Sequence, residues 1–201
     1  VTYEGVDTKI SNFKFQISNK KPIISERYFL YVGNAYPHKD LQTLVRAFQQ
    51  SAKLVLVGKD DFFYRRLRKE VKQLEISDGV IFFGEATDDQ LANLYTHAVA
   101  LVFPSKMEGF GLPVIEALSM GCAVIASDIP AFREILGDCA TFFPVGDAEA
   151  LTKRLVAALE GDIVKPSADK IVSLLSSFQW PTLARATLDT YENSSRVRSG
   201  N

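Results

Sequence analysis

Short runs of almost purely apolar residues alternate with amphipathic stretches along most of this chain, and this alternation constrains the fold more than any other feature. Strands that are covered on both faces of a parallel sheet consist of such runs, whereas half-exposed strands alternate apolar and polar residues. The chain therefore contains candidates for buried parallel strands. Five segments have this character, at residues 28–32, 53–57, 80–83, 99–103 and 122–126.

The stretches between these runs carry the signals of helices. Leu41, Leu44 and Phe48 recur at the spacing of one helical face. Thr87-Asp88-Asp89-Gln90 has the residues of a capping box, with which a helix begins. A further helix is expected to start around Pro113, since proline is favoured at the first helical position. Strand–helix–strand units repeated in this way predict an α/β domain with a Rossmann-like, doubly wound parallel sheet.

The composition excludes several other classes of protein. Apolar residues make up 47% and charged residues 23% of the 201 residues, as in a soluble globular domain, and the net charge of −1 gives no electrostatic reason to expect a nucleic-acid partner. The longest apolar stretch, residues 98–103, is far shorter than the roughly 20 residues of a membrane span. Cys122 and Cys139 do not lie at metal-ligand spacing with His38 or His97, so we expect partly buried, reduced thiols in a cytoplasmic protein and no metal site.

Ligands of a doubly wound sheet bind outside the carboxyl ends of its strands, where loops lead into helices. Several of these loops contain glycine, which lets backbone amides approach a ligand closely. The candidate site is therefore sought in the loops at residues 33–39, 58–61, 84–87, 104–112 and 127–130.

The loop at residues 104–112 is the most informative of these. Its backbone amides would lie at the positive end of the following helix, where they could bind an anion. Glu108 and Glu116 frame the loop, and a carboxylate readily accepts hydrogen bonds from the paired hydroxyls of a sugar or a ribose. The alternative interpretation is that Glu116, in the first helical turn, only complements the helix dipole and that Glu108 is solvated.

A second candidate is Lys39, which enters the next helix beside Asp40, a plausible cap. Its ammonium group could reach a phosphate at the same rim, and the alternative is an ordinary surface lysine.

The basic stretch that runs from Arg65 to Lys72 is interpreted as a solvated helix face, with contact to anionic lipid as the alternative. The glycine spacing matches neither a dinucleotide-binding loop nor a P-loop.

Several segments of the sequence, taken together and in this order, resemble one family. They are Glu108-Gly-Phe-Gly-Leu-Pro-Val-Ile-Glu116, Phe103-Pro-Ser105 before it, and Ala117-Leu-Ser-Met-Gly-Cys-Ala-Val-Ile-Ala-Ser127 after it. Together they resemble the C-terminal, donor-binding domain of retaining family 4 glycosyltransferases, which is one half of a GT-B fold. The resemblance runs from about residue 28 to residue 159.

The resemblance implies a role for each matching residue. Glu116 would hold the ribose hydroxyls of a nucleotide sugar, Glu108 would contact the transferred sugar, and Lys39 would bind phosphate. Asn34 stands where many members of the family have an arginine, and His38 occupies a place that is basic in some members. The implied catalytic residues are Glu108 and Lys39, and the implied donor-binding residues are Gly33, Asn34, His38, Gly58, Gly84, Glu85, Gly109, Phe110, Gly111, Leu112 and Glu116.

The resemblance also implies a domain organisation. We expect a linker at residues 1–27, a nucleotide-sugar-binding domain at 28–178, a C-terminal helix at 179–193 that returns toward a missing N-terminal acceptor-binding domain, and a tail at 194–201. The buried side of that helix is expected to consist of Leu183, Ala184, Thr187, Leu188 and Tyr191.

The expected function is a metal-independent transfer of a hexose, with retention of configuration, to a hydroxyl of a sugar or lipid-linked acceptor. GDP-mannose is favoured as the donor and a UDP-sugar comes next, with no further cofactor. The chain alone would bind the donor without transferring it, and a peripheral contact of the full enzyme with the inner face of the membrane stays open. The alternatives are a non-catalytic nucleotide-sugar-binding module and, less favoured by the glycine pattern, an NAD-dependent oxidoreductase.

Overall fold

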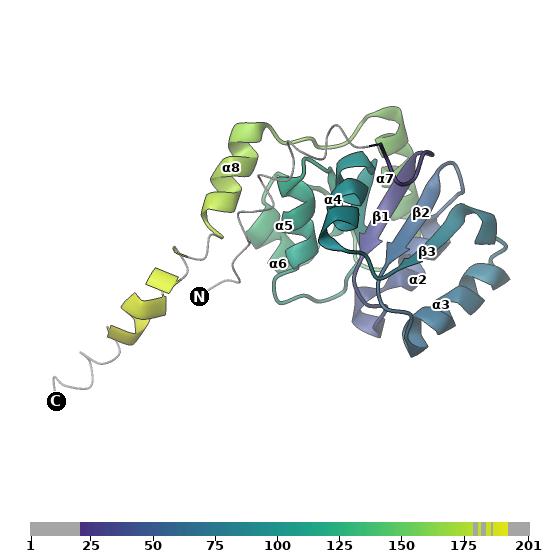
Figure 1. Cartoon of the computed structure of the whole chain (residues 1–201), viewed down its shortest axis with the longest axis horizontal. Helices are drawn as coiled ribbons and strands as arrows, with labels where there is room; N and C mark the ends of the chain where they lie inside the picture. Colours follow the sequence, from purple (N-terminus) through teal and green to yellow (C-terminus); the bar gives the residue numbers. More distant parts are fainter. Residues whose placement is uncertain (1–20, 179–180, 182–183, 186, 193–201) are drawn as a thin grey trace.

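The computed structural model describes residues 21–178, 181, 184–185 and 187–192, which contain a six-stranded sheet between layers of helices (Figure 1). The strand order is β3-β2-β1-β4-β5-β6, and every neighbouring pair is parallel. This is the order of a Rossmann-like, doubly wound sheet, so the predicted fold class is confirmed. The strands are β1 (Tyr28–Val32), β2 (Lys53–Val57), β3 (Val80–Gly84), β4 (Ala100–Phe103), β5 (Val124–Ser127) and β6 (Thr141–Phe143).

All five predicted runs form strands, and β1 and β2 have the predicted bounds. Strand β5 begins two residues later than the apolar run predicts, because the backbone N–H of Cys122 still donates to the carbonyl of Ala117 in the preceding helix. Strand β6 is not among the predicted strands, since its three residues are too few to form a recognisable apolar run.

Helices cover both faces of the sheet. The helices are α2 (Leu41–Ala47), α3 (Phe62–Gln73), α4 (Asp88–His97), α5 (Leu112–Ser119), α6 (Pro130–Leu136), α7 (Ala148–Glu160) and α8 (Ala168–Ser176), with short 3-10 turns η1 (Pro37–Lys39) and η2 (Ser77–Gly79). Right-handed crossovers put α2 and α3 on one face of the sheet and α4, α5 and α6 on the other (Figure 1). Helix α7 packs against α2, and its Thr152 hydroxyl donates to the carbonyl of Ala47 in α2 at 3.0 Å.

Several local predictions are confirmed. The Thr87 hydroxyl accepts from the Gln90 amide at 3.3 Å and the Gln90 side chain accepts from the Thr87 amide at 2.9 Å, which is a complete capping box. Helix α5 begins at Leu112, one residue before the expected Pro113. Cys122 and Cys139 are unpaired and buried.

The core is continuous through both faces of the sheet. Leu30, Leu54 and Leu101 are fully buried on three adjacent strands. Burial of each such side chain is worth about 1.5–3 kcal/mol, which makes the sheet a rigid base for the loops at its edge. None of the helices in the described ranges is long and apolar enough to cross a membrane.

The C-terminal segment corrects one prediction. Residues 187–192 are helical, as expected, but Leu188 and Tyr191 are 56% and 71% exposed because the segment extends away from the sheet (Figure 1). Of the other residues expected on the buried side, Ala184 is exposed, Thr187 is half-buried, and Leu183 lies outside the described residues. Residues 1–20 of the predicted linker, part of the predicted helix at 179–193 and the predicted tail at 194–201 lie outside the described residues.

Candidate functional site

The centre of the sheet has a topological switch point between β1 and β4. The two strands are neighbours, but the chain continues from β1 toward β2 and from β4 toward β5, on opposite sides. Loops that leave in opposite directions open a crevice at the carboxyl ends of the strands, which is where ligands bind in sheets of this kind. The two loops concerned, residues 33–40 and 104–111, hold most of the predicted site residues.

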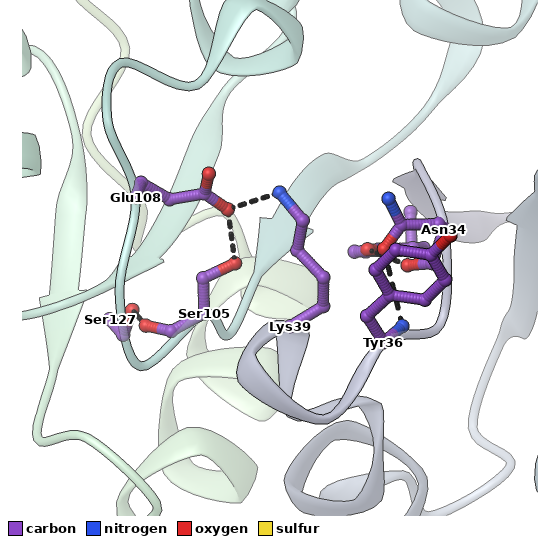
Figure 2. Close-up of polar contacts among 7 residues, drawn as sticks. Asn34, Tyr36, Lys39, Ser105, Glu108 and Ser127 are labelled. Carbon is purple, nitrogen blue, oxygen red and sulfur yellow. Dashed lines mark hydrogen bonds and ion pairs between the residues drawn. The ribbon is translucent and has the colours of Figure 1, made fainter. Parts of the chain in front are cut away.

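Lys39 and Glu108 meet in this crevice. The Lys39 Nζ atom lies 2.6 Å from Glu108 Oε1, and the two side chains are only 14% and 9% exposed (Figure 2). The Ser105 hydroxyl donates to the same carboxylate oxygen at 2.7 Å. The Lys39 ammonium also lies 5.4 Å from the centre of the Phe103 ring, within reach of a cation–π interaction. The two predicted catalytic residues therefore form one partly buried ion pair, a contact that the sequence did not predict.

Hydrogen bonds between the two loops hold Lys39 in this position. The backbone N–H of Lys106 donates to the carbonyl of His38 at 2.8 Å, and the Lys106 ammonium lies 3.1 Å from the Asp40 carboxylate. Asp40 also accepts a hydrogen bond of 2.7 Å from the Thr43 hydroxyl. Asp40 occupies the N-cap position of α2 as predicted, but its side chain does not cap the helix. Its backbone is left-handed (φ 51°), whereas a capping side chain needs extended backbone.

Two buried serines support the Glu108 side of the pair. Ser105 and Ser127 are both fully buried, and the Ser127 hydroxyl donates to the backbone carbonyl of Ser105 (Figure 2). This bond ties the chain just after β4 to the end of the neighbouring strand β5. The sequence analysis assigned no role to either serine. The sequence did contain one signal for them, because each serine is a polar residue at or just beyond the carboxyl end of an apolar strand.

The N-terminus of α5 borders the same crevice. Gly111 precedes the helix with left-handed backbone (φ 90°), and a Cβ atom there would come within 2.8 Å of the Phe132 ring. Phe110 is buried and packs edge-to-face on Phe178, with ring centres 5.1 Å apart, which fixes the loop. In the described part of the chain no side chain caps α5, and its first turn holds no acidic residue. Such a terminus presents backbone N–H donors and a positive dipole end to an anion.

Glu116 lies in the second turn of α5, not in the first turn as predicted. It therefore does not serve simply as a partner of the helix dipole. The hydroxyl of the buried Tyr95 in α4 donates to Glu116 Oε2 at 3.0 Å, and within the described ranges no hydrogen bond reaches Oε1. Burial raises the pKa of Glu116 above its ordinary value, the hydrogen bond from Tyr95 opposes that rise, and the charge of Asp88 adds to it. The free oxygen is available to a hydroxyl group.

Three of the predicted glycines stand at the ends of adjacent strands. The Gly33 amide donates to Val57 and the Gly58 amide donates to Gly84, both at 2.9 Å. A Cβ atom on Gly58 would lie 2.1 Å from the Gly33 carbonyl oxygen, so close packing of the two backbones explains this glycine without a ligand. Glu85 follows the edge strand β3 and is exposed. Among the described residues, no hydrogen bond or ion pair links Glu85 to Lys39 or Glu108.

Asn34 and His38 take local roles. The Asn34 side chain accepts a hydrogen bond from the Tyr36 amide at 3.2 Å (Figure 2). The backbone carbonyl of Asn34 accepts one from the Tyr31 hydroxyl at 2.6 Å. The His38 ring lies edge-on to the Tyr36 ring at 6.2 Å and is half-buried. Neither side chain contacts the Lys39–Glu108 pair through a hydrogen bond in the described residues.

One other prediction concerns residues away from the crevice. Arg65, Arg66, Lys69 and Lys72 are exposed on α3, which is the predicted solvated helix face. His97 ends α4, and its Nδ1 lies 2.9 Å from the carbonyl of Asn93. Among the residues that the structure describes, no group of three or more His, Cys, Asp or Glu side chains could hold a metal ion.

Comparisons with known proteins match the chain to one family and its fold to solved structures. The family described as Glycosyl transferases group 1 matches residues 13–172. The O-antigen chain mannosyltransferase RfbU of Salmonella typhimurium is 36% identical over 154 residues, which are 73% of this chain and 43% of that protein. The O-antigen chain mannosyltransferase B of Escherichia coli is 26% identical over 88% of this chain and 48% of its own length. The structure of sucrose-phosphate synthase from Thermosynechococcus elongatus superposes with a TM-score of 0.76 at 27% identity, covering 96% of this chain and 52% of that one.

Proposed function

Because the chain belongs to the glycosyl transferases group 1 family, we propose that the crevice between the ends of β1 and β4 binds the nucleotide sugar of a glycosyl transfer reaction. The observation that carries this proposal is the partly buried Lys39–Glu108 ion pair beside the uncapped N-terminus of α5. It combines a cation and backbone donors for a diphosphate with a carboxylate for hydroxyl groups. The chain spans about half the length of the relatives it matches, so the activity of the whole protein is part of the proposal.

Each group in the crevice takes one part of the donor. Glu116 accepts hydrogen bonds from the ribose hydroxyls through its free oxygen, while Tyr95 holds the other oxygen. Lys39 and the amides of Gly111 and Leu112 face the diphosphate, and Glu108 accepts hydrogen bonds from the transferred sugar. This division is the one that the family resemblance implies, and the chemistry of the groups allows it, since carboxylates accept from hydroxyls and helix N-termini bind phosphate.

The proposed transfer needs no metal ion and retains the anomeric configuration. The bond between the anomeric carbon and the phosphate oxygen breaks, and the charge that develops on the diphosphate meets Lys39 and the α5 amides, which are already in place. The acceptor hydroxyl attacks the same face of the sugar and gives its proton to the departing phosphate oxygen. Its oxygen forms the new glycosidic bond, so no enzyme nucleophile is required.

Mannose is the proposed sugar and GDP-mannose the proposed donor, with a UDP-sugar as the next choice. The support is that both O-antigen relatives are named as mannosyltransferases. A second domain, which these longer relatives have room for, would supply the acceptor site. The acceptor is a sugar or a lipid-linked sugar, and in the second case the full enzyme works in peripheral contact with the membrane.

A transfer assay tests this proposal, with a protein that carries both this chain and the proposed acceptor-binding domain. Incubation with GDP-mannose and a mannose-terminated acceptor in EDTA should release GDP and form a linkage of the same anomeric configuration as the donor, as read by NMR. A requirement for added divalent metal would contradict the metal-free reaction, and an inverted linkage would contradict retention. The chain alone should bind the donor without transferring the sugar, so transfer by this chain would contradict the need for a second domain.

A further inference from the structure

The two oxygens of the Glu108 carboxylate have different surroundings. Oε1 accepts from the Lys39 ammonium at 2.6 Å and from the Ser105 hydroxyl at 2.7 Å (Figure 2). Within the described residues, Oε2 has no hydrogen-bond donor. The carboxylate is nevertheless partly buried, since its side chain is only 9% exposed. A partly buried carboxylate with one free oxygen gains from a ligand that supplies a donor and loses from one that supplies only negative charge.

The charge of the pair matters for a diphosphate ligand. Lys39 and Glu108 together carry no net charge, so the carboxylate removes much of the attraction that the ammonium would otherwise exert. A free nucleoside diphosphate also carries more negative charge than a nucleotide sugar, because its terminal phosphate has a second ionisable oxygen with a pKa of about 6. In the nucleotide sugar that oxygen is bonded to the sugar. Glu108 therefore repels the free nucleotide more than it repels the intact donor.

The sugar provides the compensating interaction. A hydroxyl of the bound sugar can donate to Oε2, the one oxygen that the described part of the protein leaves free, whereas a free nucleotide has no such donor in this place. We propose that Glu108, held by Ser105, makes the site select the intact nucleotide sugar over the free nucleoside diphosphate. This inference rests on the proposed function, and it assigns to the same carboxylate a second effect, which is weaker binding of the nucleotide product.

Ser105 is the positioning residue in this arrangement. When a phosphate attracts the Lys39 ammonium, the Ser105 hydroxyl is the donor that still holds Oε1 and keeps Oε2 directed at the sugar. Ser105 is suited to this role because it is fully buried and its backbone carbonyl is itself held by the Ser127 hydroxyl. The carboxylate on the long Glu108 side chain would otherwise follow the ammonium.

Calorimetric titration of the chain with GDP and with GDP-mannose tests the inference, with UDP and UDP-glucose titrated in parallel. In Glu108→Gln the repulsion is lost, so the nucleotide should bind about tenfold more tightly, while the nucleotide sugar should bind no more tightly than before. In Ser105→Ala the nucleotide affinity should stay within about twofold and the nucleotide-sugar affinity should fall about five- to tenfold, the loss of one hydrogen bond to a charged acceptor. Ser119→Ala is the matched control, since Ser119 is also a buried serine with a bonded hydroxyl, in α5.

Both variants thus lower the selectivity for the nucleotide sugar over the free nucleotide. Glu108→Gln does so by strengthening nucleotide binding, and Ser105→Ala does so by weakening nucleotide-sugar binding. An equal change of both affinities in Glu108→Gln, or a loss of both in Ser105→Ala, would overturn the inference and leave the proposed donor site intact. Failure of every nucleotide and nucleotide sugar to bind the unaltered chain at millimolar concentration would instead overturn the proposed function, and the selectivity with it. A changed ratio in Ser119→Ala would show that any buried serine has this effect and would also overturn the role of Ser105.

Discussion

The hydroxyl group of Tyr95 in α4 donates a hydrogen bond of 3.0 Å to Oε2 of Glu116 in α5. Tyr95 is buried, and burial raises its pKa well above the ordinary value, so the hydroxyl stays protonated and remains a donor. The contact joins the two helices on one face of the sheet and fixes the direction of the Glu116 carboxylate. The proposed ribose-binding group is therefore oriented before any ligand arrives.

Glu116→Gln should raise the stability of the chain at neutral pH. Burial raises the pKa of Glu116 in the folded state above its ordinary value of 4.5, so the folded chain holds this proton more tightly than the unfolded chain does. The ionised carboxylate consequently costs stability above the folded-state pKa, and the cost disappears as the pH falls below 4.5. Melting curves should show a higher Tm for the variant at pH 7, by about 2–4 °C for each kcal/mol relieved, and no gain at pH 4. The exposed Glu160 provides a control substitution, and a gain that is the same at both pH values would contradict this account.

Tyr95→Phe should weaken nucleoside binding and make it more sensitive to acid. The lost hydrogen bond favours the ionised form of Glu116, so its removal raises the pKa of that carboxyl further. Titration with guanosine, which carries no phosphate, should show a loss of affinity on acidification that begins at a higher pH than in the unaltered chain. If affinity falls at the same pH in the two proteins, Tyr95 does not control the pKa of the Glu116 carboxyl.

Gly58→Ala should destabilise the domain far more than Gly109→Ala. The added Cβ at residue 58 would lie 2.1 Å from the backbone oxygen of Gly33 and 2.5 Å from the Tyr64 hydroxyl, so two strand ends would have to separate. A Cβ atom added to Gly109 would have no such neighbour within 4 Å. Urea denaturation should give a loss of about 3 kcal/mol or more for the first variant and less than about 1 kcal/mol for the second, as for strained and unstrained sites in general. Equal losses would mean that the Gly33 and Gly58 backbones are not packed together in solution.

Asn34→Arg should increase affinity for a nucleoside diphosphate. The substitution adds a cation to the loop that carries Lys39, and it removes only the side-chain bond to the Tyr36 amide, since the bond from Tyr31 goes to the backbone carbonyl. Calorimetry should give a several-fold lower Kd for GDP, in line with about 1 kcal/mol for one partly exposed charge, and an unchanged Kd for guanosine. An equal change for both ligands would mean that the new side chain does not face the phosphates.

Much of the fold could be predicted because its information is local. Residues 28–32 and 53–57 are apolar almost throughout, which is what burial on both faces requires, and these strands have the predicted bounds. The capping box at Thr87 depends on four consecutive residues, and its prediction is confirmed. Strand β6 is too short to carry a pattern, and the exposed positions of Leu188 and Tyr191 cannot be read from an apolar helical spacing that normally marks a buried face.

The site could be predicted as a set of residues but not as a set of contacts. Lys39 and Glu108 are 69 positions apart, and they meet only because β4 inserts beside β1 after the chain has passed through β2 and β3. The hydrogen bonds from Ser105 and Tyr95 depend in the same way on packing between elements. Their residue types, a serine after an apolar strand and a tyrosine in an amphipathic helix, are too common to indicate a role.

The central claim is that Lys39 binds the diphosphate and Glu116 binds the ribose of one nucleotide in one crevice. Calorimetric titration of Lys39→Ala and Glu116→Ala with GDP and with guanosine, all in EDTA, tests it most directly, with UDP and uridine in parallel. We expect Lys39→Ala to weaken the diphosphate about tenfold and the nucleoside hardly at all, while Glu116→Ala weakens both by about 1–3 kcal/mol, the range for a hydrogen bond to a charged group. Unchanged GDP affinity in Lys39→Ala, or unchanged guanosine affinity in Glu116→Ala, would contradict the account.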